Sequence, residues 1–331
     1  MRRSDAPRAA FRRWPAVLLI LAALGLLTGP APDAVAQPVP TLDPFPSAAP
    51  TPSVGTVALH PVPTTPPQRS GIRWNRFAVA SGILTTSYVG QYIIERKKWW
   101  SGTTVPFHFD SKPSYARGMD KMAHFYGAEV QALTNARLLE WSGVPPAKAA
   151  LWASVLSLAG QTNVEIHDGF NPQWGFDVYD QLANTMGVAW FYAHERVPAL
   201  RRFDIRLSYW HPNLRPFNKD KNITPFTNDY SGHAYWVSMR VWDLLPDGVQ
   251  RYWPRFLMLS AGVTVNDWTR YPDSDAYLST HVSVDLDWRE IIPRDSWIGR
   301  SVGDLLNRYH LPAPAIQVTP RPGVSLIFVG Q

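Results

Sequence analysis

Residues 165–187 read EIHDGFNPQWGFDVYDQLANTMG and place four carboxylates, one histidine and four aromatic residues between two apolar stretches. The stretch before it begins at Pro146 and is apolar all round in its first half, so a helix there is expected to be buried in protein or lipid. After the GFNPQW loop, Asp177 is a good N-cap for a helix from Val178 to His194. The segment therefore predicts two helices joined by a loop that concentrates acidic groups where the helices meet.

Two more helices are expected before this segment. The pattern is helical from Ile72 to Lys97, and residues 77–94 carry no charge. About 18 uncharged residues are just enough to span a bilayer, although Ser, Thr and Gln make the run only weakly apolar. A helix buried on one protein face is the preferred interpretation, with membrane insertion as the alternative. A further helix is predicted from Ser114 to Ser142. Small residues that would let these helices approach closely are Gly127, Ala128, Gly160, Gly187 and Ala189.

After Pro198 the sequence changes to the period-two alternation of β-strands. In YLSTHVSVDLDW (277–288), Val282 and Val284 share one face, whereas Ser283 and Asp285 lie on the other. Such one-sided strands favour a sheet whose apolar face packs on the helices, and about five strands are too few to close an outer-membrane barrel. A short helix is expected at 299–310. The other predicted strands are FDIRLSYW (203–210), AYWVSMRVW (234–242), FLMLSAGVTV (256–265) and VSLIFVG (324–330).

These patterns predict an α+β fold, in which an N-terminal four-helix bundle, membrane-associated or periplasmic, precedes a C-terminal antiparallel β region. Residues 1–36 resemble a secretory signal peptide, with a basic start, a short apolar run and an Ala-Val-Ala cleavage pattern. Residues 37–70 carry ten prolines and are expected to form a semi-rigid linker. The domain boundaries are therefore set at 71–197 for the helical core and 198–331 for the β-rich region.

The composition limits the location and the partners of the protein. The chain has no cysteine, which excludes disulfides, thiolate metal sites and a lipid attached to an N-terminal cysteine. The net charge of +6 falls to about +3 without residues 1–36, so no nucleic-acid partner is inferred. Fifteen Trp residues suit an interfacial or membrane-facing protein and are also compatible with an aromatic-rich core. The expected location is exported, either periplasmic or associated with the outer membrane, with helix 72–97 as the segment that could be embedded.

Three pairs of polar residues are candidates for chemistry. In MDKMAHF (119–125), Asp120 and His124 are spaced to share a helical face, where a carboxylate can orient the imidazole. Glu165 and Asp168 are spaced three apart and could share a proton or bind a hard cation. Each pair also has a structural interpretation as a helix-capping or helix-steadying interaction. Asp180 and Asn184 form the third pair, and a mid-helix Asn in an apolar run needs partners from another helix.

The motifs MDKMAHF, EIHDGFNPQWGFDVYDQLANTMG and NDYSGHAYWVS, in this order, resemble the YfiM-like family. This is a bacterial envelope domain of unknown function whose members are regarded as lipoproteins, and the resemblance covers residues 99–246. VanZ-like membrane proteins are a more distant likeness. The resemblance implies an envelope location and brings no established activity. It also implies a shared polar cluster, whose members would be Asp120, Lys121, His124, Glu165, Asp168, Asp180 and Asn184. Asp177 stands where the family usually has Ser, and the lipoprotein Cys is absent.

Three functions remain open on these grounds. The first is a non-catalytic, membrane-associated protein with a structural or accessory role in envelope organisation. The second is a hydrolase or transferase acting on a lipid-linked or glycan substrate, with Glu165 or Asp168 as acid or base and His124 polarised by Asp120. The third is a divalent-cation-binding protein that uses the same carboxylates. No phosphate loop or dinucleotide fingerprint occurs, so no other cofactor is expected. The expected partner is a membrane or another envelope component, and the sequence names no protein partner.

Overall fold

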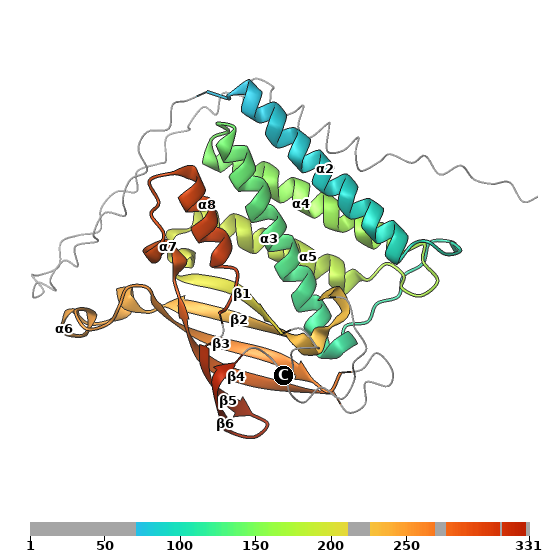
Figure 1. Cartoon of the computed structure of the whole chain (residues 1–331). Coiled ribbons are helices and arrows are strands. Elements are labelled where there is room, and N and C mark those ends of the chain that lie inside the picture. Colours follow the sequence, from blue (N-terminus) through green and yellow to red (C-terminus); the bar gives the residue numbers. More distant parts are fainter. Residues whose placement is uncertain (1–70, 211–225, 269–275, 312, 329–331) are drawn as a thin grey trace, which may run out of the picture.

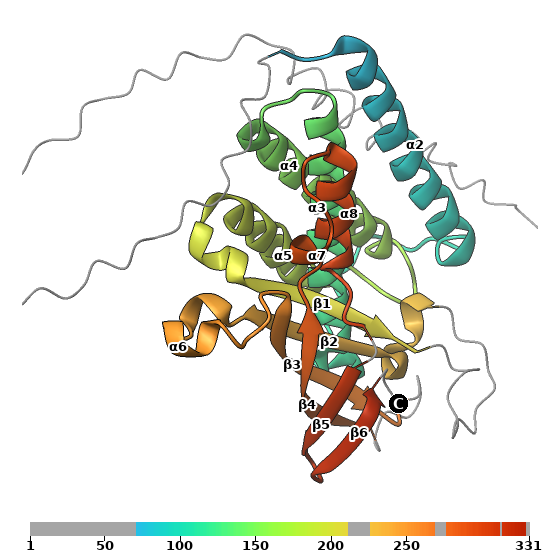
Figure 2. The ribbon, with the colours of Figure 1, turned by 60° about the vertical axis from the view of Figure 1, so that its left-hand side comes forward.

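The structure is a computed structural model that describes residues 71–210, 226–268, 276–311 and 313–328. The predicted signal peptide and linker lie outside these residues. Helices α2 to α5 pack above an antiparallel sheet, with β1 nearest the helices and the β5–β6 hairpin farthest from them (Figures 1 and 2). The predicted α+β class is confirmed, although the described residues hold seven α-helices rather than four. The division at residue 197 stays a prediction, since α3 packs against both α8 and β1.

Helix α2 (Trp74–Lys98) lies along the outside of the bundle (Figure 2). Its buried residues are Phe77, Ala80, Leu84, Tyr88 and Glu95, which recur at helical spacing along one stripe. Only 17% of its most apolar 18-residue window is buried, and the helix is long and apolar enough to cross a membrane. The expected burial along one side of the helix is therefore found. Large apolar side chains on its other side, among them Val79, Ile83 and Ile94, are exposed to solvent.

The bundle proper consists of α3 (Met119–Trp141), α4 (Pro146–Asp168) and α5 (Val178–Arg196). Pro146 occupies the first turn of α4, and the Asp177 side chain accepts a hydrogen bond from Tyr179 N at 2.8 Å, as predicted for an N-cap. Helices α3 and α5 approach so closely that a Cβ on Gly187 would lie 2.1 Å from the carbonyl oxygen of Phe125. This close packing brings the polar residues of the two helices within contact distance.

The sheet has six strands in the order β1-β2-β3-β4-β5-β6, all antiparallel. Their bounds are β1 Phe203–Tyr209, β2 His233–Arg240, β3 Leu257–Asn266, β4 Tyr277–Leu286, β5 Ala313–Thr319 and β6 Gly323–Phe328. The sequence missed β5 because Pro314 and Pro320 interrupt its pattern, and prolines normally argue against a strand. The short elements α6 (Asp247–Gln250), α7 (Trp288–Ile291) and α8 (Trp297–Leu306) flank the strands, so the predicted helix at 299–310 begins and ends earlier.

The burial of the strands corrects one expectation. In β4 the predicted apolar face is open, with Val282 45% exposed, whereas Ser283 and Asp285 on the polar face are buried. On the buried face, Trp236 of β2 packs with Ala315 of β5, although β3 and β4 lie between these strands, so the sheet is strongly curved. The β1 edge is covered where Leu207 bridges Tyr309. Only part of the apolar face packs on α3, where Tyr235 and Val265 belong to one buried cluster with Met119 and Tyr126. The remainder faces away from the helices.

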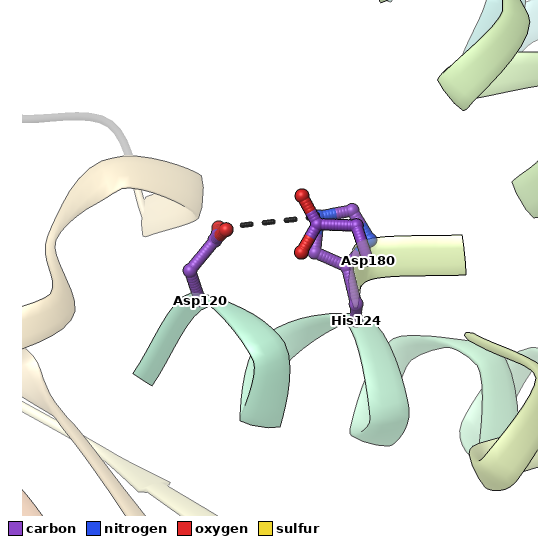
Figure 3. Close-up of side chains that lie close together, drawn as sticks. All are labelled: Asp120, His124 and Asp180. Carbon is purple, nitrogen blue, oxygen red and sulfur yellow. Dashed lines mark ion pairs between the residues drawn. The ribbon is translucent and has the colours of Figure 1, made fainter. Parts of the chain in front are cut away.

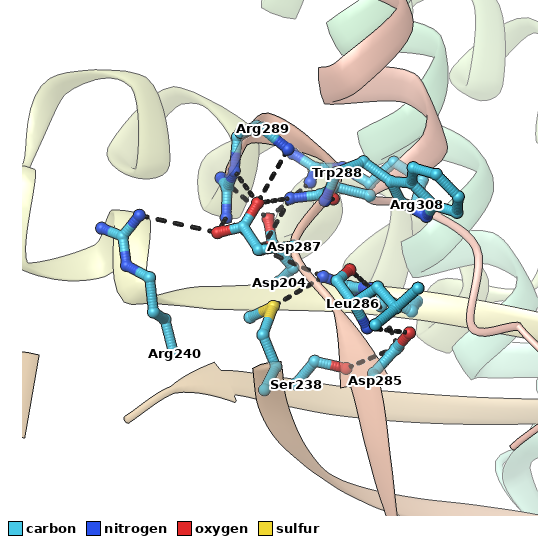
Figure 4. A network of polar contacts seen from close by, with 12 residues as sticks. Asp204, Ser238, Arg240, Asp285, Leu286, Asp287, Trp288, Arg289 and Arg308 are labelled. Carbon is cyan, nitrogen blue, oxygen red and sulfur yellow. Dashed lines mark hydrogen bonds and ion pairs between the residues drawn. The ribbon is translucent and has the colours of Figure 1, made fainter. Parts of the chain in front are cut away.

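A buried ionic network joins the sheet to the bundle (Figure 4). Arg308 follows α8 and pairs with Glu129 of α3 at 2.7 Å and with Asp204 of β1 at 2.8 Å. Arg289 of α7 also pairs with Asp204, at 2.6 Å. Arg206 of β1 contacts Asp285 of β4 at 2.8 Å on the polar side of the sheet. Because such buried charges depend on their partners, this network fixes the sheet against the helices.

Candidate functional site

The candidate site is a polar cluster at the junction of three helices. Asp120, Lys121 and His124 lie in the first two turns of α3, and Asp180 begins α5. Glu165 comes from the last turns of α4 and is only 1% exposed. Hence the segment quoted at the outset supplies residues from both sides of its loop. The structure brings together six of the seven predicted members, namely Asp120, Lys121, His124, Glu165, Asp180 and Asn184.

Lys121 is the centre of the acidic side of the cluster. Its ammonium lies 2.9 Å from Asp120 Oδ2, 2.9 Å from Asp177 Oδ2 and 2.7 Å from Asp180 Oδ1. The three carboxylates come from α3 and from the start of α5, so Lys121 links the two helices. Asp177 therefore has a second role beside its N-cap hydrogen bond. Strong coulombic attraction is expected because all four side chains are largely removed from water.

His124 lies beside the carboxylates of Asp120 and Asp180 (Figure 3). Its Nε2 is 3.9 Å from Asp120 Oδ1 and 3.7 Å from Asp180 Oδ2, too long for direct hydrogen bonds. Its Nδ1 lies 3.3 Å from Asn184 Oδ1 and 3.4 Å from Glu165 Oε1. Asn184 in turn donates to Glu165 Oε1 at 3.3 Å. The mid-helix asparagine thus has the interhelical partners that its burial requires.

Asp168 is the predicted member that lies apart from this group. Its Oδ1 accepts a hydrogen bond from Trp100 Nε1 at 2.6 Å, and Trp100 stacks on His167 at 4.6 Å between ring centroids. The structure adds Tyr230, which lies in the segment between β1 and β2. Its hydroxyl donates a hydrogen bond to Asp120 Oδ1. Tyr230 was missed because it is 110 residues from Asp120, and its only sequence signal was its place in the NDYSGHAYWVS motif.

The charges of the cluster are not balanced by its own residues. Four carboxyl groups face two basic side chains, Lys121 and His124. Burial, together with neighbouring acids, raises the pKa of Glu165 to about 8 and that of Asp180 to about 7. Burial disfavours the charged form of His124, but Asp120, Asp180 and Glu165 outweigh this and raise its pKa to about 9.

Three of these groups could hold a metal ion. One ligand atom each from Asp120, His124 and Asp180 lies within 4.8 Å of the others. Ligands about 2.1 Å from a tetrahedral ion are about 3.4 Å apart, so the two His124 separations need to shorten by only a few tenths of an ångström. An imidazole beside two carboxylates favours Zn²⁺ or Mn²⁺ over Ca²⁺ or Mg²⁺, which prefer oxygen ligands alone. By residue type these three side chains could hold a divalent transition-metal ion, in competition with the Lys121 ammonium that already binds both carboxylates.

Acid–base catalysis requires room for a substrate beside the reacting group. Glu165 is sealed between helices, and Asp168 is already bonded to Trp100. The most open side chain of the central group is His124, which is 22% exposed. The cavity that the structure shows among the described residues lies at Trp141, at the opposite end of α3 from Asp120. The geometry shows direct interhelical linkage through Lys121 and Asn184.

Residues 108–194 match the model of a family described as "Predicted periplasmic lipoprotein (DUF2279)". The match covers about a quarter of the chain and includes every predicted member of the polar cluster, but not Tyr230 or the sheet. No curated protein and no solved structure matches the chain. The family description supports an exported, periplasmic protein of the cell envelope and assigns no activity to it.

Proposed function

We propose that this protein is a membrane-associated accessory protein of the bacterial cell envelope, which contacts lipid through the open side of α2. The observation that carries this proposal is the surface of that helix. Apolar residues exposed on it are Trp74, Val79, Ile83, Ile93 and Ile94, at 44–64% exposure. Large apolar side chains gathered on one exposed helix often mark a membrane or partner contact.

Lipid is a better occupant of this surface than another protein because of the residues at the two ends of the helix. The central 18 residues carry no charge, whereas Arg73 and Arg76 lie at one end and residues 96–98 are Arg-Lys-Lys at the other. Trp74 and Trp99 accompany the basic residues. Basic and Trp residues at both ends of an apolar segment are typical of helices in contact with a bilayer and its headgroups.

Flotation with phospholipid vesicles tests this proposal. We expect the full chain to float with vesicles of phosphatidylethanolamine and phosphatidylglycerol, and the double variant Ile83→Asp/Ile94→Asp to lose about 90% of that binding. Leu244→Asp/Val249→Asp changes two similarly exposed apolar residues away from α2 and is the matched control. Equal flotation of the wild type and the α2 variant would show that this helix face is not the membrane contact.

We further propose that the polar cluster binds a divalent cation that stabilises the junction of α3 and α5. The supporting observation is the convergence of His124 Nε2 with carboxylates of Asp120 and Asp180 in a group with excess acidic residues. The motif likeness to YfiM-like and VanZ-like proteins is consistent with such a shared cluster. A hydrolase or transferase is less favoured, because Glu165 is sealed from substrate.

Thermal melts with EDTA, and then with Zn²⁺ or Mn²⁺, test the cation proposal. The wild type is expected to melt several degrees higher with the ion, and Asp180→Asn is expected to lose this increase. Asp168→Asn is the control, since Asp168 is another aspartate of the same sequence segment that lies outside the three-ligand group. If neither ion changes the melting of the wild type, the cluster is a structural network held by Lys121.

A further inference from the structure

A second polar site lies at the opposite end of α3 from the cluster. A cavity of about 220 Å³ forms where the start of α2, the end of α3 and the first turn of α8 meet. Its lining includes three arginines, two tryptophans and one glutamate, namely Arg73, Arg76, Arg300, Trp141, Trp297 and Glu140. Asp120 and Glu140 are 20 residues apart on α3, which places this cavity about 30 Å from the polar cluster.

Three arginines and one glutamate line this cavity, so its lining carries a net positive charge. Glu140 already accepts a hydrogen bond from Arg137 Nη1 at 2.8 Å. Arg76 stacks over the Trp141 ring, 5.3 Å from its centroid, and Arg300 donates to the carbonyl oxygen of Arg294 at 3.2 Å. Within the described part of the chain, no carboxylate lies within ion-pair distance of Arg73, Arg76 or Arg300. Three arginines that line one cavity and form no ion pair among the described residues favour an anionic ligand.

The walls of the cavity are held by contacts between the three segments. Arg73 N donates to Ser142 O at 2.8 Å, which fixes the start of α2 against the α3–α4 turn. In that turn Gly143 has φ +91°, and a Cβ there would lie 2.6 Å from the Gly71 carbonyl oxygen. Trp297 donates its indole N–H to Arg137 O at 2.8 Å. The cavity is therefore preorganised, which reduces the entropy cost of binding a ligand.

We propose that this cavity binds the phosphate group of an amphipathic phosphate ester. Guanidinium groups hydrogen-bond phosphate oxygens in pairs and retain their charge at every physiological pH. The two indole rings, 5.9 Å apart between centroids, offer an apolar surface to the ester side of the ligand. A phospholipid headgroup and a soluble phosphate ester both carry this chemistry.

Two measurements on the full chain distinguish these sources. In the first, glycerol 3-phosphate is titrated while melting is followed. In the second, the chain is floated with phosphatidylcholine vesicles that contain or lack phosphatidylglycerol. The test variant is Arg300→Ala, which changes a lining residue on α8 and leaves the α2 surface intact, and Arg300→Lys is a milder change that keeps the charge. Arg255→Ala is the matched control, because Arg255 also stacks on a tryptophan, Trp242, at 4.3 Å.

We expect Arg300→Ala to lose about tenfold in affinity for a phosphate ligand, while Arg255→Ala binds like the wild type. Loss of the melting shift with glycerol 3-phosphate assigns the site to soluble esters. Loss of only the phosphatidylglycerol-dependent flotation assigns it to lipid headgroups. If Arg300→Ala and Arg300→Lys match the wild type in both assays, or if the wild type responds to neither ligand, the proposal is wrong. Either result would leave the α2 proposal intact, since that proposal is tested by the flotation of Ile83→Asp/Ile94→Asp, in which Arg300 is unchanged.

Discussion

His124 Nε2 lies 3.7 Å from Asp180 Oδ2, whereas Lys121 Nζ lies 2.7 Å from Oδ1 of the same carboxylate. One side chain of α5 therefore contacts two basic residues of α3 through its two different oxygens. The Lys121 contact is a direct ion pair, and the His124 separation leaves the spacing that a shared ion would use. Substitutions of Lys121 and of Asp180 are therefore expected to change the stability of the α3–α5 junction in different ways.

Lys121→Met should destabilise the protein by about 3–5 kcal/mol in EDTA, because it leaves three buried carboxylates without their common partner. A divalent cation should recover part of this loss, since it can supply the missing positive charge. Denaturant unfolding with EDTA and with Zn²⁺ measures both effects. Lys148→Met, which changes an exposed lysine of α4, is expected to have no measurable effect. A loss that Zn²⁺ does not reduce would argue against a cation at this junction.

Gly187→Ala should cost about 1–3 kcal/mol, because the new methyl group would overlap the carbonyl oxygen of Phe125 and push α5 away from α3. Gly127→Ala is a matched change in α3, where an added Cβ meets nothing within 4 Å. That variant should be neutral or more stable by about 0.5–1 kcal/mol, because alanine is the better helix former. Urea unfolding compares the two, and similar losses would show that the helices do not approach at Gly187.

Arg308→Met should destabilise the fold by about 3–5 kcal/mol, since it leaves Glu129 and Asp204 buried without their shared guanidinium. The loss should appear as reduced cooperativity between the helices and the sheet, which this network joins. Guanidinium chloride unfolding, followed both by circular dichroism and by tryptophan fluorescence, measures it. Arg255→Met, at an exposed position, should change stability by less than about 0.5 kcal/mol. Comparable small effects of both variants would contradict the role of the network.

His310→Phe should make the protein less sensitive to acid. Burial and the nearby Arg206 lower the pKa of His310 to about 4, and its ring stacks on Trp236 at 4.0 Å. The unfolded chain binds this proton near pH 6.5, so native stability falls as pH decreases from about 6.5 to 4. Phenylalanine keeps the stacking and removes the titration. Between pH 7 and pH 4, the wild type should lose about 1–3 kcal/mol more than the variant. Equal losses in denaturant unfolding would show that His310 is not one of the groups responsible.

Local sequence signals predicted the elements that depend on nearby residues. Pro146 and Asp177 marked the starts of α4 and α5 correctly, because capping and first-turn preferences act within a few residues. Strand β5 was missed, since its prolines break the local pattern and only pairing with β4 and β6 stabilises it. The apolar face of β4 was predicted to be buried, but Val282 on this face is exposed. The polar face is buried instead, because Asp285 there pairs with Arg206 of β1.

The sequence by itself determined the α+β order of elements, the caps and the spacing that puts Asp120 and His124 on one helical face, because these features follow from local backbone preferences. Tertiary structure alone decided which groups meet. Tyr230 reaches Asp120 across 110 residues, and Asp168 turns to Trp100 rather than to His124. Arg73, Arg76 and Arg300 likewise converge from two distant helices. Such contacts depend on how helices and sheet pack to bury their apolar surface, and no local preference encodes that arrangement.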